Sequence, residues 1–127
     1  MRSILDTSVL LGPSPGEIQG EIAISTVSLA ELHFGVLVAK TDSIRATRLR
    51  RLATIEQTFQ ALAVDATVAR EYGRLAAAVV AAGRQPRARA MDLLIAATAS
   101  ANEARLYTRN PSDLVGLEDV LEIIGVN

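Results

Sequence analysis

The sequence has no cysteine, one histidine and no long apolar run, and each of these absences excludes a class of chemistry. Without cysteine there is no disulfide, thiolate nucleophile or zinc–thiolate site, which agrees with a reducing compartment. With His33 alone, a nuclease that uses two histidines as general acid and base cannot be built. No apolar stretch reaches the roughly 18 residues that a membrane span needs, so we expect a cytoplasmic protein without a membrane segment.

Neither sign of charge is in excess, because 13 Lys and Arg residues face 14 Asp and Glu residues, for a net charge of −1. Such a chain has no overall attraction for a polyanion, so nucleic-acid binding requires local patches. Arginines cluster in residues 45–51 and 84–89. Such arginine runs usually lie on solvent-exposed faces, and contact with phosphate is the alternative interpretation of both clusters.

The composition is that of a packed globule. Hydrophobic residues make up 50% of the 127 residues, charged residues 21%, and Gly and Pro are few. This length is typical of one compact domain. We therefore expect a single domain over residues 1–127.

Short apolar runs that end in polar turn formers predict strands, and apolar residues at helical spacing predict helices. Asp65 is placed as an N-cap and Gly83 as the end of one helix. The expected strands lie at 4–5, 21–25, 61–64, 105–108 and 121–124, and the expected helices at 27–38, 43–58, 66–82 and 89–102. Alternating strands and helices predict an α/β fold, a parallel sheet covered on both faces, with ligands at the carboxyl ends of the strands.

Four carboxylates stand in unusual surroundings. Asp6 follows the first strand, and Asp113 follows the strand at 105–108 across a short turn, so both lie on the expected ligand edge. Glu31 shares the apolar stripe of its helix with Val27, Phe34 and Val38, at offsets of four, three and seven residues. Asp92 is surrounded by apolar residues, where an unpaired charge costs several kcal/mol or becomes protonated.

A divalent cation would compensate for these charges. Mg²⁺ and Mn²⁺ prefer carboxylate oxygens and water, and converging carboxylates repel one another until a cation binds. Bound metal ions also support phosphodiester hydrolysis without a side-chain base. The polar neighbours Ser8, Thr108 and Asn110 are expected to orient the carboxylates or bound water.

Each of the four acids also has a purely structural interpretation. Ser28 and Glu31 match the S-x-x-E capping box, and Asp6 is a candidate cap for a following helix. Asp92 is placed to complement a helix dipole, and Asp113 is a common turn residue. The residues alone leave these alternatives open.

Five segments, ILDTSVLL, STVSLAELHFG, AREYGRLAA, AMDLLIAATA and LYTRNPSDL, span nearly the whole chain. In order and spacing they resemble the PIN-domain toxins of the VapC type. The resemblance implies a PIN-like α/β/α sandwich with a short central parallel sheet. It departs from the family at one point, where Leu114 follows the last aspartate in place of a frequent aromatic residue.

The resemblance further implies an Mg²⁺- or Mn²⁺-dependent endoribonuclease, the toxin of a type II toxin–antitoxin system, which hydrolyses RNA to leave a 5′-phosphate. The family's acidic quartet falls on Asp6, Glu31, Asp92 and Asp113. By this likeness Asp6 and Asp92 are the leading metal ligands and Glu31 holds a metal-bound water. Asp113 completes the site with Asn110 nearby.

The partners that the resemblance implies are RNA and a VapB-type antitoxin. The antitoxin's C-terminal segment is expected to wrap a toxin homodimer and block the site, and the apolar helices around residues 34–38 and 44–55 offer a groove for it. RNA contacts are expected at Arg87, Arg89 and Arg109.

Three alternatives remain. A phosphatase with Asp6 as nucleophile would resemble the haloacid-dehalogenase-like enzymes, but those carry D-x-D where this chain has Asp-Thr-Ser. A PIN fold without catalysis is a second, which the intact acids disfavour. A housekeeping RNA-processing nuclease is the third, and the sequence decides neither this question nor the RNA target.

Overall fold

A computed structural model describes all residues, 1–127, and contains one five-stranded sheet in the order β3-β2-β1-β4-β5. The strands are β1 (Arg2–Leu5), β2 (Glu21–Ser25), β3 (Gln60–Leu62), β4 (Ala104–Thr108) and β5 (Ile123–Gly125). Every neighbouring pair is parallel, as predicted. The predicted ranges of β1, β3, β4 and β5 are wrong by one or two residues at one or both ends, because pairing between neighbouring strands sets their limits.

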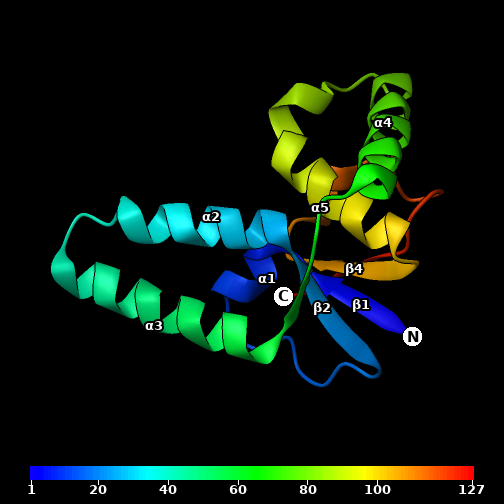
Figure 1. Ribbon diagram of the computed structural model, residues 1–127. Helices are drawn as coiled ribbons and strands as arrows, with labels where there is room; N and C mark the ends of the chain where they lie inside the picture. The colour runs from blue at the N-terminus through cyan, green and yellow to red at the C-terminus, as the bar shows by residue number, and fades with distance from the viewer.

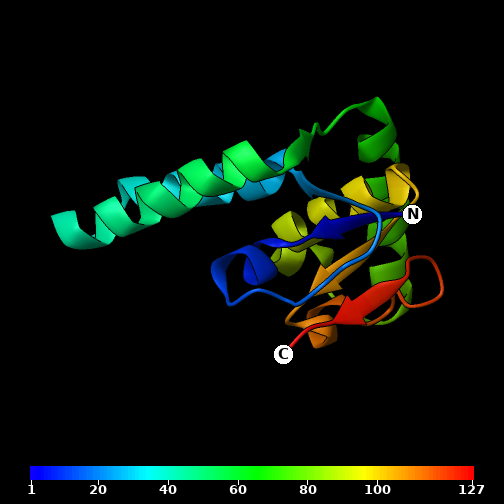
Figure 2. The ribbon, with the colours of Figure 1, turned by 90° about the horizontal axis from the view of Figure 1, so that it is seen from below.

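Helices cover both faces of the sheet (Figure 1). They are α1 (Thr7–Leu11), α2 (Thr26–Leu37), α3 (Asp42–Thr58), α4 (Ala66–Ala81) and α5 (Ala90–Ala101), with short 3₁₀ turns at Pro86–Arg89 and Pro111–Leu114. The hairpin of α2 and α3 extends well beyond the sheet (Figure 2). No helix is both long enough and apolar enough to cross a membrane.

The core is divided by the sheet, because successive side chains of a strand point to opposite faces. Ile4 and Leu106 belong to the cluster that includes α4 and α5, whereas their neighbours Leu5 and Tyr107 pack in the cluster beneath α1, α2 and α3. The predicted α/β/α sandwich is therefore confirmed.

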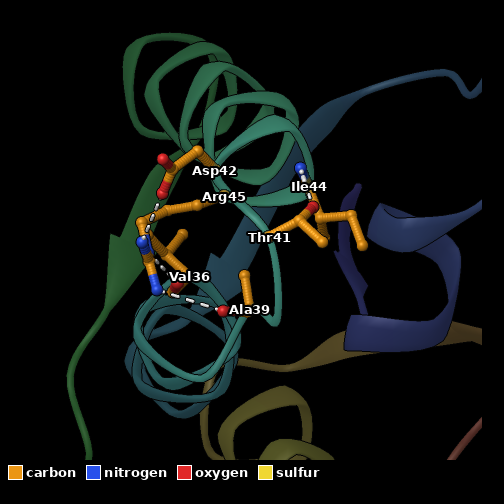
Figure 3. A network of polar contacts seen from close by, with 6 residues as sticks. All are labelled: Val36, Ala39, Thr41, Asp42, Ile44 and Arg45. Atoms are coloured by element: carbon orange, nitrogen blue, oxygen red, sulfur yellow. Dashed lines mark hydrogen bonds and ion pairs between the residues drawn. The ribbon is translucent and has the colours of Figure 1, made fainter.

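The turn between α2 and α3 is fixed by Arg45 (Figure 3). Its guanidinium donates to the carbonyl oxygens of Ala39 at 3.0 Å and Val36 at 3.4 Å, and pairs with Asp42 at 3.3 Å. The last carbonyls of a helix have no partner within it, so these bonds cap the end of α2. The expected helical hairpin is confirmed, and it holds α2 at the edge of the sheet.

Glu71 ties α4 to α5. Its carboxylate accepts hydrogen bonds from Arg74 Nε at 2.8 Å and from Ser100 Oγ at 2.8 Å. These bonds, Arg74 first, lower the pKa of Glu71 to about 2. Because Ser100 lies on α5, the contact helps to fix the helix that carries Asp92.

Candidate active site

The two central strands bring polar residues together at their carboxyl ends. β1 is followed by Asp6, whose backbone N–H donates to the carbonyl of Tyr107 on β4 at 3.1 Å. The Asp6 carboxylate accepts from Ser8 Oγ at 2.6 Å and from the Val9 N–H at 3.1 Å, so Asp6 is also the N-cap of α1. Capping fixes the orientation of this carboxylate at the sheet edge.

Three of the predicted acids line one small cavity of about 40 Å³ beyond this edge. Its wall is formed by Asp6, Ser8, Asp92, Leu106, Thr108, Asn110, Asp113 and Leu114. All three residues that we expected to orient the acids are therefore present. Ser8 Oγ also accepts from the Arg109 N–H at 3.0 Å, and Thr108 Oγ1 accepts from the Asn110 N–H at 3.0 Å, so these hydroxyls hold the ends of β1 and β4 in place.

Asp92 lies in the first turn of α5 and is half-buried. Burial raises its pKa, and the negative charges of Glu31, Asp113 and Asp6 raise it further, whereas Arg89 opposes this shift. Asp92 is the one member of the quartet without a hydrogen bond or ion pair. The four acids therefore repel one another, and Asp92 bears the largest cost.

Glu31 lies outside the small cavity, on a neighbouring groove of about 500 Å³. Its carboxylate accepts from Thr7 Oγ1 at 2.6 Å, and Thr7 Oγ1 also lies 2.9 Å from Ser28 Oγ. The capping-box interpretation of Glu31 is wrong, because α2 begins at Thr26 with Ser25 as its N-cap. Thr7 was not among the residues that we expected to orient the acids, and nothing in the sequence links it to Glu31.

The apolar stripe that was expected around Glu31 is only partly correct. Val27 is buried, but Phe34 and Val38 are 65% and 51% exposed. Leu32 and Val36 are buried instead, because α2 leaves the sheet after its first turns and packs on α3. Glu31 thus lies at the margin of the buried face, where its charge keeps contact with solvent.

Asp113 lies in the short turn after β4 and pairs with Arg89 Nη2 at 3.1 Å. The next residue, Leu114, is only 3% exposed and belongs to the core cluster of α4 and α5. Leucine at this place, where the resembling family often has an aromatic residue, anchors the turn by burial.

Arg109 does not extend toward the acids as expected of an RNA contact. Its guanidinium donates to the carbonyl of Ser8 at 3.3 Å and to those of Pro13 and Asn127. These bonds join the loop after α1 to the C-terminal segment, which makes Arg109 a structural clamp. For Arg87, which lines neither the small cavity nor the groove, and for Arg89, RNA contact stays a prediction.

The donor set of this site suits a hard divalent cation, because every acid offers carboxylate oxygens and the neighbours offer hydroxyl and amide oxygens. In the present side-chain positions no three acids come close enough to ligate one ion together. Asp6, Glu31 and Asp113 are each turned toward a protein donor, namely Ser8, Thr7 and Arg89. Each of these bonds engages one carboxylate oxygen and leaves the other free, so ligation by the full set requires the acids to move closer together but not to leave these donors.

Comparison with known proteins agrees with this architecture. A family model for the PIN domain matches residues 3–112. The chain is 37% identical to Ribonuclease VapC5 of Mycobacterium tuberculosis, over 97% of this chain and 94% of the relative. It is 34% identical to Ribonuclease VapC4 of the same organism, over 98% of this chain and 97% of the relative.

A solved structure gives the same result. The chain matches a member of the VapBC family of toxin–antitoxin systems, VapBC-5 from Mycobacterium tuberculosis, with a TM-score of 0.87 and 36% identity over 98% of both chains. The chain therefore belongs to the PIN-domain family and, within it, to the VapC-type ribonucleases.

Proposed function

We propose that the protein is a metal-dependent endoribonuclease and the toxin of a type II toxin–antitoxin pair. The observation that carries this proposal is the juxtaposition of Asp6, Asp92 and Asp113 in one cavity at the carboxyl ends of the central strands. The raised pKa of Asp92 supports it, because charge repulsion of this kind is typical of a cation site. The ribonuclease names of the relatives point to the same chemistry.

In this proposal Asp6 and Asp92 hold Mg²⁺ or Mn²⁺, and Asp113 completes the site beside Asn110. A bound divalent cation supplies an activated water and stabilises charge on the phosphate oxygens. Ser8 fixes the Asp6 carboxylate at 2.6 Å, and Thr7 holds Glu31 in position to orient the attacking water. Such outer partners commonly matter by about 10- to 100-fold in activity or metal affinity.

The groove of about 500 Å³ beside Glu31 is, in the same proposal, the binding site for a VapB-type antitoxin. Leu11, which is 49% exposed, and Phe34 offer apolar contacts, and Arg48 and Arg51 favour an acidic segment. The groove reaches Glu31, so an occupant would block the site. The proposal includes a toxin homodimer within this complex, acting in the cytoplasm.

Cleavage of RNA by antitoxin-free protein tests the activity. We expect Asp6→Asn to lower the rate in Mg²⁺ or Mn²⁺ at least about 100-fold, because it removes a ligand charge. Asp65→Asn is the matched control, since Asp65 is also a helix N-cap but lies on α4, outside the site. Asparagine caps helices as well as aspartate does, so both variants should fold.

The assay uses a panel of structured RNAs with a chelator as the metal-free arm. Equal rates for Asp6→Asn and the control, or cleavage that persists in chelator, would disprove the metal-dependent mechanism. Absence of cleavage of every RNA, with metal present, would favour the silent binding module. Growth arrest on expression, relieved by a neighbouring antitoxin gene, separates a toxin from a housekeeping nuclease.

A further inference from the structure

A second cavity, of about 310 Å³, lies directly beside the acid cavity, and Asp113 forms part of both walls. Its remaining wall comes from the C-terminal end of α4, the segment 83–89, the start of α5 and Val115. Nothing in the metal chemistry requires this cavity. Its position next to the acids and its composition therefore call for a separate role.

Local structure directs the arginines of this segment to the site. Gly83 has φ +78° and ends α4, with its N–H and that of Arg84 donating to the carbonyls of Val80 at 2.9 Å and Val79 at 3.0 Å. A residue with a side chain is strained at this φ, so glycine makes the turn possible. The segment that follows places Arg84 and Arg89 on the wall of the second cavity.

The second cavity combines positive charge with apolar surface. Arg84 donates to the carbonyl of Ser112 at 3.4 Å, and Arg89 pairs with Asp113 at 3.1 Å while remaining 45% exposed. Ala88 and Val115 contribute apolar surface to the same cavity. Guanidinium groups suit phosphate oxygens, and an adjoining apolar wall suits the face of a base.

We propose that this second cavity is the subsite for the nucleotide next to the cleaved phosphate of a single-stranded RNA. This inference rests on the proposed nuclease function. Arg84 contacts the backbone phosphate, and Arg89, at the boundary of the two cavities, contacts the phosphate nearest the acids. The base lies against Ala88 and Val115.

Continuity and charge favour RNA over a protein segment as the occupant. A strand cleaved at the acid cavity must continue past Asp113, and the second cavity is the adjoining space on that side. The phosphate that enters it meets Arg84 and Arg89, whereas the acids on the other side repel it. Two guanidinium groups therefore offset the repulsion that a strand meets at the quartet.

The test is the binding of a fluorescein-labelled single-stranded RNA, measured by anisotropy in the full-length Asp92→Asn protein without divalent ions. The Asp92→Asn protein is expected to leave the RNA intact, so the anisotropy measurement reports binding without cleavage. We expect Arg84→Ala to weaken binding about tenfold. We also expect the slope of log affinity against log salt to become shallower by about 0.7, the effect of one lost phosphate contact on a single strand.

Arg70→Ala is the matched control, since Arg70 is an exposed arginine in the first half of α4 whose side chain hydrogen-bonds only to Thr67. It should change the affinity less than twofold. Ala88→Leu is a second variant, which fills the cavity without changing charge. It should weaken binding while leaving the salt slope unaltered.

Equal effects of Arg84→Ala and Arg70→Ala would overturn the subsite, as would the absence of RNA binding at the lowest salt. If Arg84→Ala lost binding to a polyglutamate peptide but kept its RNA binding, the occupant would be an acidic protein segment. This result would also overturn the RNA subsite. Arg84-dependent RNA binding in a protein that never cleaves RNA would refute the nuclease function alone. Cleavage without Arg84-dependent binding would refute the subsite alone.

Discussion

Asp92→Asn is expected to raise the stability of the metal-free protein and to abolish its RNA cleavage. Burial and three neighbouring acids raise the pKa of Asp92, so its charged form opposes folding at neutral pH. Removing that charge should add up to about 1 kcal/mol to the free energy of unfolding, because solvent screens the charge of a half-exposed group. The same change removes a proposed metal ligand, so cleavage should fall at least about 100-fold.

The stability advantage of Asp92→Asn should depend on pH in a defined direction. A carboxylate with a raised folded-state pKa is protonated more readily in the folded than in the unfolded chain, so its unfavourable contribution disappears as the pH falls. In a chelating buffer, the advantage of Asp92→Asn over the natural protein should shrink between neutral pH and about 4. Urea unfolding at several pH values measures this, and a variant less stable than the natural protein at pH 7 would contradict it.

Leu75→Ala should produce the largest loss of stability. Leu75 on α4 is fully buried against α5, so truncation removes apolar contact and leaves a cavity. Substitutions of this kind cost about 3–4 kcal/mol, a large share of the roughly 5–15 kcal/mol that stabilises a typical domain. Urea unfolding of the natural protein and of Leu75→Ala measures the difference in the free energy of unfolding.

Val80→Ala is the control for this prediction, because Val80 lies on the same helix and is 59% exposed. Its effect should stay within about 0.5 kcal/mol. If Leu75→Ala cost no more than Val80→Ala, the packing of α4 on α5 would have to be wrong.

The parallel sheet and its helices were predictable, because their signals are local and periodic. Alternating apolar runs and helical stripes placed all five strands, and Asp65 was correctly predicted as the N-cap of α4. The short helix α1 was predicted only as the helix that Asp6 would cap, an alternative that the structure confirms, because five residues carry no periodic pattern of their own. Strand limits at β5 depend on pairing with β4, which no local pattern contains.

The acids of the site were predictable for a different reason. Asp92 stands out because charge among apolar residues is costly, and its raised pKa has the expected physical cause. The contacts of Arg109 with Pro13 and Asn127 were not predictable, since these acceptors lie far away in the sequence and only the fold brings them near. Glu31 was predicted from an apolar helix face of which only Val27 is buried in the structure. Its hydrogen bond with Thr7 could not be predicted from the sequence.

The central claim, that the acids form a cation site, is tested most directly by calorimetric titration of Mn²⁺ into antitoxin-free protein. We expect saturable binding in the natural protein and in Asp65→Asn, and affinity at least about tenfold weaker in Asp6→Asn and Asp92→Asn. Equal Mn²⁺ affinity in all four proteins, or no saturable binding in the natural one, would contradict the claim.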